Sequence, residues 1–253
     1  MRILNIIGAP RLHGNTVALV KKFTEGAVSA GAEVEDIVLS KLKIRPCIDC
    51  DKCEYDGICK TKDDFTWVRE KMLAADAFCL ASPVYCCNVS GFMKAWMDRC
   101  NCLNYPNYHR GLVGKKAAII VASGYPMPPE VLMALDLEGI EEVDSRIKAV
   151  AADSLRCALD LFKPFDATVD ALRTLYEFCV FTGMQAVGAV EVCGLAHDPN
   201  AVKQRQHDLD KAFLLGVTLV ESLKPGWNPF AAPLGQQRKY ATDIKFGSAG
   251  PVS

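Results

Sequence analysis

The sequence predicts a single doubly wound α/β domain, in which helices cover both faces of a parallel sheet. The chain has 253 residues, of which 50% are hydrophobic, and this is enough for one sizeable core. Apolar runs of strand length alternate with segments of helical periodicity. Some of these runs are apolar throughout, as expected of strands buried on both faces. This alternation favours parallel strands joined by right-handed crossover helices.

Each element of the predicted fold follows from its local pattern. The strands share short apolar or alternating runs and are predicted at Arg2–Ile7, Glu33–Leu39, Ala77–Ser82, Lys116–Ala122 and Ala186–Val192. The helices share apolar residues spaced three and four apart. Four of them are predicted at Asn15–Ala30, Ser90–Cys102, about Ala167–Phe181 and about Asn200–Leu223, and another, second along the chain, ends at about Ala75. Asp63 or Asp64 is expected to cap the second helix, and Gly183 to end the fourth.

Two segments depart from the regular alternation. Residues 126–165 are predicted to be a helical insertion after the fourth strand, with an amphipathic helix at Ile140–Phe162. After Lys224 the composition changes to Pro, Gly, Ser and Ala. We therefore expect a domain of residues 1–225 and a C-terminal extension, 226–253, that is disordered or lies across a neighbouring subunit.

Charge and hydropathy argue against several classes of partner. Twenty-nine Lys and Arg balance 30 Asp and Glu, so the chain has no excess of positive charge that would attract nucleic acid. The longest apolar stretches fall short of the roughly 20 residues that cross a membrane, and the N-terminus enters a strand without a signal peptide pattern. We expect a soluble cytoplasmic protein. Because thiols stay reduced there, the 12 cysteines indicate metal or redox chemistry.

The loop after the first strand has the character of a phosphate site. The segment Gly8-Ala9-Pro10-Arg11-Leu12-His13-Gly14-Asn15-Thr16 lies between a strand and a helix, where backbone N–H groups and the helix N-terminus attract phosphate. Its glycines allow close approach, and Arg11, Asn15 and Thr16 add donors. The dinucleotide and P-loop fingerprints are absent. The alternative is that Gly14-Asn15-Thr16 is only a turn and a helix cap.

Two further loops are predicted at the same edge of the sheet. Ser82–Ser90 follows the third strand, and Ser123-Gly124-Tyr125 follows the fourth. Doubly wound sheets bind ligands beyond the carboxyl ends of their strands. Tyr85 is a candidate stacking platform, with a half-buried aromatic at a strand end as the alternative. The three loops together predict one ligand site.

Four cysteines lie in one loop after the second strand. Cys47, Cys50, Cys53 and Cys59 form CxxCxxCxxxxxC, a spacing suited to a cuboidal iron-sulfur cluster. Structural zinc usually takes two CxxC pairs with a longer spacer, so zinc is the weaker interpretation. A reduced thiol loop without metal stays open as an alternative.

These motifs resemble those of the NAD(P)H-dependent FMN reductases of the flavodoxin-like superfamily, and specifically the iron-sulfur flavoproteins. Gly8–Thr16 matches the family pattern Gly-Ser-Pro-Arg, two residues, Gly-Asn-Thr, except that Ala9 replaces Ser. Ser82–Arg99 matches Ser-Pro-Val-Tyr, two residues, Asn-Val-Ser-Gly, two residues, Lys, three residues, Asp-Arg. Lys94, Asp98 and Arg99 in this motif are interpreted as structural helix charges.

The resemblance implies a flavodoxin-like sheet of five parallel strands in the order 2-1-3-4-5. It implies that the FMN phosphate is held by residues of the first loop, namely Pro10, Arg11, Gly14, Asn15 and Thr16. The isoalloxazine ring would lie along residues of the other two loops, namely Pro83, Val84, Tyr85, Asn88, Ser123, Gly124 and Tyr125. The four cysteines would hold a [4Fe-4S] cluster.

The function expected from this resemblance is that of an FMN-dependent oxidoreductase that passes electrons between FMN and the cluster. NAD(P)H is the expected co-substrate, a homodimer or homotetramer the expected assembly, and a ferredoxin-type protein a candidate redox partner. No catalytic side chain is assigned, since the flavin carries the redox chemistry. The alternatives are a cluster-free NAD(P)H-dependent FMN or quinone reductase and a non-catalytic flavin electron carrier.

Overall fold

The protein folds around a parallel sheet with the strand order of flavodoxin-like proteins. The computed structural model describes residues 1–104, 111–124, 168–195 and 198–227. The parallel strands are ordered β2-β1-β3-β5-β6, which is the predicted order. They span Arg2–Ile7 (β1), Glu33–Val38 (β2), Ala77–Tyr85 (β3), Lys116–Ala122 (β5) and Gln185–Val192 (β6), and β4, Asn88–Val89, pairs antiparallel with β3.

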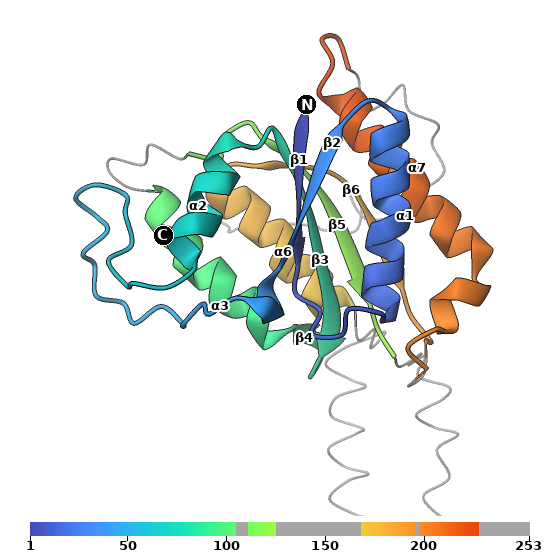
Figure 1. Cartoon of the computed structure of the whole chain (residues 1–253), viewed down its shortest axis with the longest axis horizontal. Coiled ribbons are helices and arrows are strands. Elements are labelled where there is room, and N and C mark those ends of the chain that lie inside the picture. The colour runs from blue at the N-terminus through green and yellow to red at the C-terminus, as the bar shows by residue number, and fades with distance from the viewer. Residues whose placement is uncertain (105–110, 125–167, 196–197, 228–253) are drawn as a thin grey trace, which may run out of the picture.

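Helices cover both faces of the sheet. They span Asn15–Ser29 (α1), Phe65–Ala74 (α2), Gly91–Arg99 (α3), Val169–Thr182 (α6) and Gln206–Ser222 (α7), with short 3₁₀ helices at Leu39–Lys41 (η1), Cys100–Asn104 (η2) and Ala201–Gln204 (η4). Helices α1 and α7 lie on one face, and α2, α3 and α6 lie on the other (Figure 1).

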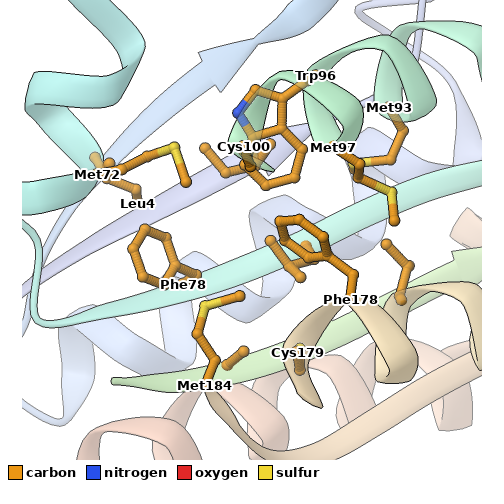
Figure 2. Packing of buried hydrophobic residues seen from close by; sticks show 14 of the residues in the cluster. Leu4, Met72, Phe78, Met93, Trp96, Met97, Cys100, Phe178, Cys179 and Met184 are labelled. Carbon is orange, nitrogen blue, oxygen red and sulfur yellow. The ribbon is translucent and has the colours of Figure 1, made fainter. Parts of the chain in front are cut away.

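The central strands bury side chains on both faces, as predicted. In β1, Leu4 and Ile6 pack toward α2, α3 and α6, whereas Ile3 and Ile7 pack toward α1 and α7. Figure 2 shows the first of these layers, where Trp96 of α3 faces Phe178 of α6 with ring centroids 5.1 Å apart. This alternation divides the core into two layers with the sheet between them.

Two glycines bring α1 and α7 into backbone contact. A Cβ atom on Gly26 would lie 2.0 Å from the Phe213 carbonyl oxygen, and one on Gly216 would lie 2.0 Å from the Phe23 carbonyl oxygen. Neither position has room for a side chain. The contact fixes how α1, which begins at the predicted phosphate loop, lies against the last helix.

The structure corrects several predicted boundaries. Strand β3 continues three residues beyond Ser82 and forms a hairpin with β4, which the sequence did not predict. The two-residue turn contains Cys86 and Cys87, whose φ angles are 48° and 60°. Two-residue hairpin turns favour Asn-Gly. The Cys86-Cys87 sequence therefore did not predict a turn at this position.

Two of the predicted helix bounds differ from those in the structure. Helix α3 ends at Arg99 and the chain continues as η2 to Asn104 rather than as one helix to Cys102. The last helix begins at Gln206 after η4, not near Asn200. Gly183 ends α6 in the left-handed region, with φ 77°, as predicted.

The predicted insertion at 126–165 lies outside the described residues, as does the predicted extension from residue 228 onward. Among the helices that the structure does describe, none is long and apolar enough to span a membrane.

Candidate functional site

The first two predicted flavin loops are joined at the carboxyl edge of the sheet by Ser90. Its hydroxyl donates to the Gly8 carbonyl oxygen at 2.7 Å, and its N–H donates to the Ser82 hydroxyl at 3.0 Å. The Gly8 N–H donates to the Ala81 carbonyl oxygen at 2.8 Å. A Cβ atom on Gly8 would lie 2.9 Å from the Ser90 hydroxyl oxygen, so this position accommodates only glycine without a shift.

The third loop is aligned with the second by strand pairing. Pro83 in β3 lies opposite Ala122 at the end of β5. Ser123, which follows Ala122, is buried; its N–H donates to the Val192 carbonyl oxygen at 2.8 Å. Gly124 is half-buried, and Tyr125 lies outside the described residues. The sheet therefore brings parts of all three predicted loops to one edge.

The N-terminus of α1 presents backbone donors at this edge that no side chain of the described residues caps. Its N-cap is Gly14, which has an extended backbone and supplies no side-chain hydrogen bond to the helix. The N–H groups of the first helical turn lack intrahelical acceptors, and with the helix dipole they form an anion site. Pro10 and Arg11 are exposed beside it. This arrangement fits a phosphate group.

Asn15 has a structural role that the sequence did not predict. Its side-chain nitrogen donates to the Asp198 carbonyl oxygen at 2.8 Å, and its side-chain oxygen accepts from the Val202 N–H at 3.0 Å. Asn15 thus connects the predicted phosphate loop to the segment before α7. Thr16 is buried in the first turn of α1.

The second loop offers an aromatic ring and an amide to a planar ligand. Tyr85 is 45% exposed, and Pro83 and Val84 are half-buried. The Asn88 side-chain oxygen accepts from the Val89 N–H at 2.7 Å and from the Thr174 hydroxyl at 3.0 Å. Within the described residues the Asn88 side-chain nitrogen has no hydrogen bond, so its N–H groups are available to a ligand.

All four cysteines of the predicted cluster motif line one pocket. Cys47 and Cys50 are exposed, Cys53 and Cys59 are half-buried, and burial raises the pKa of Cys53. Arg99 and the buried Cys102 line the same pocket. No group of three or more His, Cys, Asp or Glu is close enough to hold a metal ion in the ranges that the structure describes. The four thiols share a pocket without lying at coordinating distances from one another.

Hydrogen bonds close the neck of the cysteine loop. The Lys43 N–H donates to the Asp64 carboxylate at 2.6 Å, and the Arg45 N–H donates to the Asp63 carboxylate at 3.0 Å. The Asp63 carboxylate also accepts from the Phe65 N–H at 3.1 Å. Asp63, rather than Asp64, therefore satisfies a donor at the start of α2.

Arg99 joins this neck from the end of α3. It is 2% exposed, and its partner is Asp63. Lys94 and Asp98 form an exposed i,i+4 pair within α3. The Arg99 guanidinium stacks over the Phe65 ring. Burial by itself lowers the pKa of Arg99, but the hydrogen bonds to Asp63 outweigh burial and raise it.

Helix α3 connects the two candidate sites. Its N-cap, Ser90, forms hydrogen bonds with the first two predicted flavin loops, and Arg99 at its C-terminal end lines the cysteine pocket. Nine residue steps separate them, which correspond to about 14 Å at the helical rise. The sequence placed the sites on different loops, and α3 sets the distance between them.

Comparisons with known proteins agree with this architecture. Residues 1–129 match the model of the NADPH-dependent FMN reductase family. An iron-sulfur flavoprotein of Methanocaldococcus jannaschii is 37% identical over 119 residues, 47% of this chain and 62% of that protein. Another, from Archaeoglobus fulgidus, is 34% identical over 133 residues, 52% of this chain and 59% of that protein. The chain thus matches about three fifths of the length of these relatives.

A solved structure extends the likeness of fold. The NAD(P)H:quinone oxidoreductase of Methanothermobacter marburgensis superposes with a TM-score of 0.53 at 16% identity, covering 87% of this chain and 96% of that one. At that identity the likeness concerns the fold alone. With the family match over residues 1–129, the chain belongs to the NADPH-dependent FMN reductase family.

Proposed function

We propose that the protein is an FMN-dependent oxidoreductase that receives electrons from NAD(P)H. The observation that carries the proposal is the uncapped N-terminus of α1, at the edge where Ser90 joins two of the predicted flavin loops. A phosphate there would accept from the N–H groups of the first turn. The exposed Arg11 would add a charged fork.

The remaining loops suit the ring of the flavin. Tyr85 would stack on the ring and the Asn88 amide would donate to it, since the Asn88 oxygen is already held by Thr174. Ser123 and Gly124 would close the other side. When bound, FMN accepts two electrons and releases them singly. The protein's own part is to position the cofactor and to exclude water.

We propose further that Cys47, Cys50, Cys53 and Cys59 hold a [4Fe-4S] cluster. Two observations support this: the four thiols share one pocket, and a buried N–H of Arg99 lacks a partner among the described residues there. Such sulfur-rich sites hold iron-sulfur clusters. Two of the relatives are named iron-sulfur flavoproteins. A homodimer or homotetramer and a ferredoxin-type partner belong to the same proposal.

A cluster-free reductase is the second candidate. It is favoured by the separation of the four thiols in space, since within the described residues they form no group able to hold a metal ion. In that case the pocket would hold only reduced thiols, and electrons would pass from NAD(P)H through FMN to a small acceptor.

One preparation tests both candidates. The protein is purified without oxygen and supplied with FMN, iron and sulfide; its visible spectrum, iron and acid-labile sulfide are measured before and after NADPH. About four iron and four sulfide per chain, with flavin bands that bleach on NADPH addition, support the full proposal. Bleaching without iron leaves the cluster-free reductase. Protein that does not take up FMN contradicts the flavin site.

Cysteine variants assign the metal. Cys50→Ser and Cys53→Ser should lower bound iron and sulfide, because each removes one thiolate ligand. Cys86→Ser is the control, since Cys86 is an exposed cysteine of the β3–β4 turn and does not line the pocket. Equal iron in all three variants would contradict the assignment.

A further inference from the structure

Arg99 has one hydrogen-bond donor for which the described residues supply no acceptor. An arginine side chain carries five N–H donors, four on its terminal nitrogens and one on Nε. Nη1 donates to the Arg45 carbonyl oxygen at 2.9 Å and to Asp63 Oδ2 at 2.6 Å. Nη2 donates to the Thr61 carbonyl oxygen at 3.3 Å and to Asp63 Oδ1 at 3.0 Å. The buried Nε has no partner among the described residues.

This donor belongs to a side chain in the cysteine pocket. Arg99 and Cys59 line this pocket together, and Thr61, whose carbonyl oxygen accepts from Arg99 Nη2, lies two residues after Cys59. Because all four terminal N–H groups are taken, Nε–H is the donor left for the Cys59 sulfur. A neutral thiol is a weak acceptor, whereas a thiolate forms a stronger, charge-assisted bond.

The terminal N–H groups act on the loop itself. The Arg45 carbonyl lies before Cys47 and the Thr61 carbonyl lies after Cys59, so Arg99 holds both ends of the cysteine loop. Asp63, 4% exposed in its side chain, completes this clamp. One buried side chain thus joins the ends of the loop and lines the pocket that contains its four cysteines.

We propose that Arg99 is a positioning residue for the iron-sulfur cluster: it clamps the loop and donates Nε–H to the Cys59 sulfur once that sulfur is a metal-bound thiolate. The inference rests on the proposed cluster. Hydrogen bonds to cluster sulfurs and nearby positive charge favour the reduced cluster and raise its reduction potential. Arg99 therefore sets the potential at which electrons enter the cluster as well as the shape of the loop.

Arginine-to-lysine variants separate this role from a purely structural one. Arg99→Lys keeps the charge beside Asp63 but removes the Nε donor and the planar fork. Arg45→Lys is the matched control, because Arg45 also lies near Asp63, at 3.9 Å from Nε to Oδ2, but its side chain is 66% exposed and does not line the pocket. Iron and sulfide content, thermal unfolding and the midpoint potential from EPR-monitored redox titration are measured for both and for the unaltered protein.

Arg99→Lys should bind iron and have about a tenfold smaller ratio of reduced to oxidised cluster at a fixed potential, equivalent to about 59 mV for one electron. Arg45→Lys should keep the unaltered midpoint. An unchanged midpoint in iron-loaded Arg99→Lys would overturn the proposal while leaving the cluster intact. Unaltered protein that takes up no iron would overturn the cluster itself, and this inference with it.

A second variant covers the case in which Arg99→Lys does not fold. Asp63→Asn combined with Arg99→Gln removes the buried ion pair as a unit, so neither charge is left without its partner. The iron-loaded double variant should also have a lower midpoint than the unaltered protein. An equal midpoint in the double variant would contradict the proposal.

Discussion

Arg99 and Asp63 form a buried bidentate ion pair at the neck of the cysteine loop, with Nη1–Oδ2 at 2.6 Å and Nη2–Oδ1 at 3.0 Å. The two residues come from the end of α3 and from the segment before α2. Because both side chains are almost fully buried, neither charge is well solvated without the other. Their pairing couples the cysteine loop to the core.

Loss of this pair should destabilise the fold. Asp63→Asn leaves the buried Arg99 charge without its counterion, so the free energy of unfolding should fall by about 3 kcal/mol. Denaturant unfolding of the iron-free protein measures it. Glu25→Gln, which removes the exposed pair with Lys22, is the control and should cost under about 1 kcal/mol. Equal losses in the two variants would contradict a special role for the buried pair.

The same pair predicts a dependence of stability on pH. Burial by itself raises the pKa of Asp63, but hydrogen bonds from Arg99 and two backbone N–H groups outweigh burial and lower it. The folded-state pKa is thus below the unfolded value, so the stabilisation is complete above about pH 4 and is lost as pH falls through the folded pKa. Urea unfolding from pH 7 to pH 2 should show a smaller decline in Asp63→Asn. Parallel curves would contradict the shift.

The α1–α7 contact predicts a large cost for a single methyl group. Gly216→Ala places a Cβ atom against the Phe23 carbonyl, and overpacking of this kind costs about 1–3 kcal/mol or more. Gly91→Ala is the matched control, because a Cβ atom there meets nothing within 4 Å and alanine favours helix. Thermal unfolding should separate the two by several degrees. A stable Gly216→Ala would show that the helices can move apart without cost.

The proposed phosphate site predicts opposite effects of one substitution on stability and on binding. Gly14→Asp supplies an N-cap acceptor and a negative charge at the start of α1, and the extended backbone of Gly14 permits it. The iron-free, FMN-free protein should gain a few tenths of a kcal/mol or more. The new carboxylate occupies the donors and repels phosphate, so FMN should bind about tenfold more weakly or worse.

Riboflavin, which lacks the phosphate, provides the control for Gly14→Asp. Its affinity should change little, and fluorescence titration measures both ligands. If FMN and riboflavin lose affinity equally, the substitution perturbs the loop as a whole and the α1 N-terminus is not the phosphate site.

Asn15 allows structural and ligand roles to be separated. Asn15→Ala removes the acceptor of the Val202 N–H and the donor to the Asp198 carbonyl, and should cost about 1–3 kcal/mol of stability. If its role is mainly to hold the loop before α7, FMN affinity should fall less than in Gly14→Asp. A larger loss of FMN affinity with unchanged stability would instead make Asn15 a direct ligand contact.

Much of the fold was determined by local patterns in the sequence. Strands β1 and β5 and the end of α6 at Gly183 lie where the pattern predicted them, because a strand buried on both faces is mostly apolar and a left-handed C-cap favours glycine. The strand order followed from the family resemblance. The β3–β4 hairpin was missed, since its turn holds cysteines where glycine or asparagine is usual.

The candidate sites were determined only in part by the sequence. Local spacing named the loops, because residues near in sequence carry the phosphate-loop and cysteine motifs. The tertiary structure decided what those residues contact: Arg99 meets Asp63 across 36 positions, Asn15 meets Val202 across 187, and Gly26 and Gly216 meet other backbones. Such contacts depend on how distant segments pack, and no local periodicity encodes which buried donor meets which acceptor.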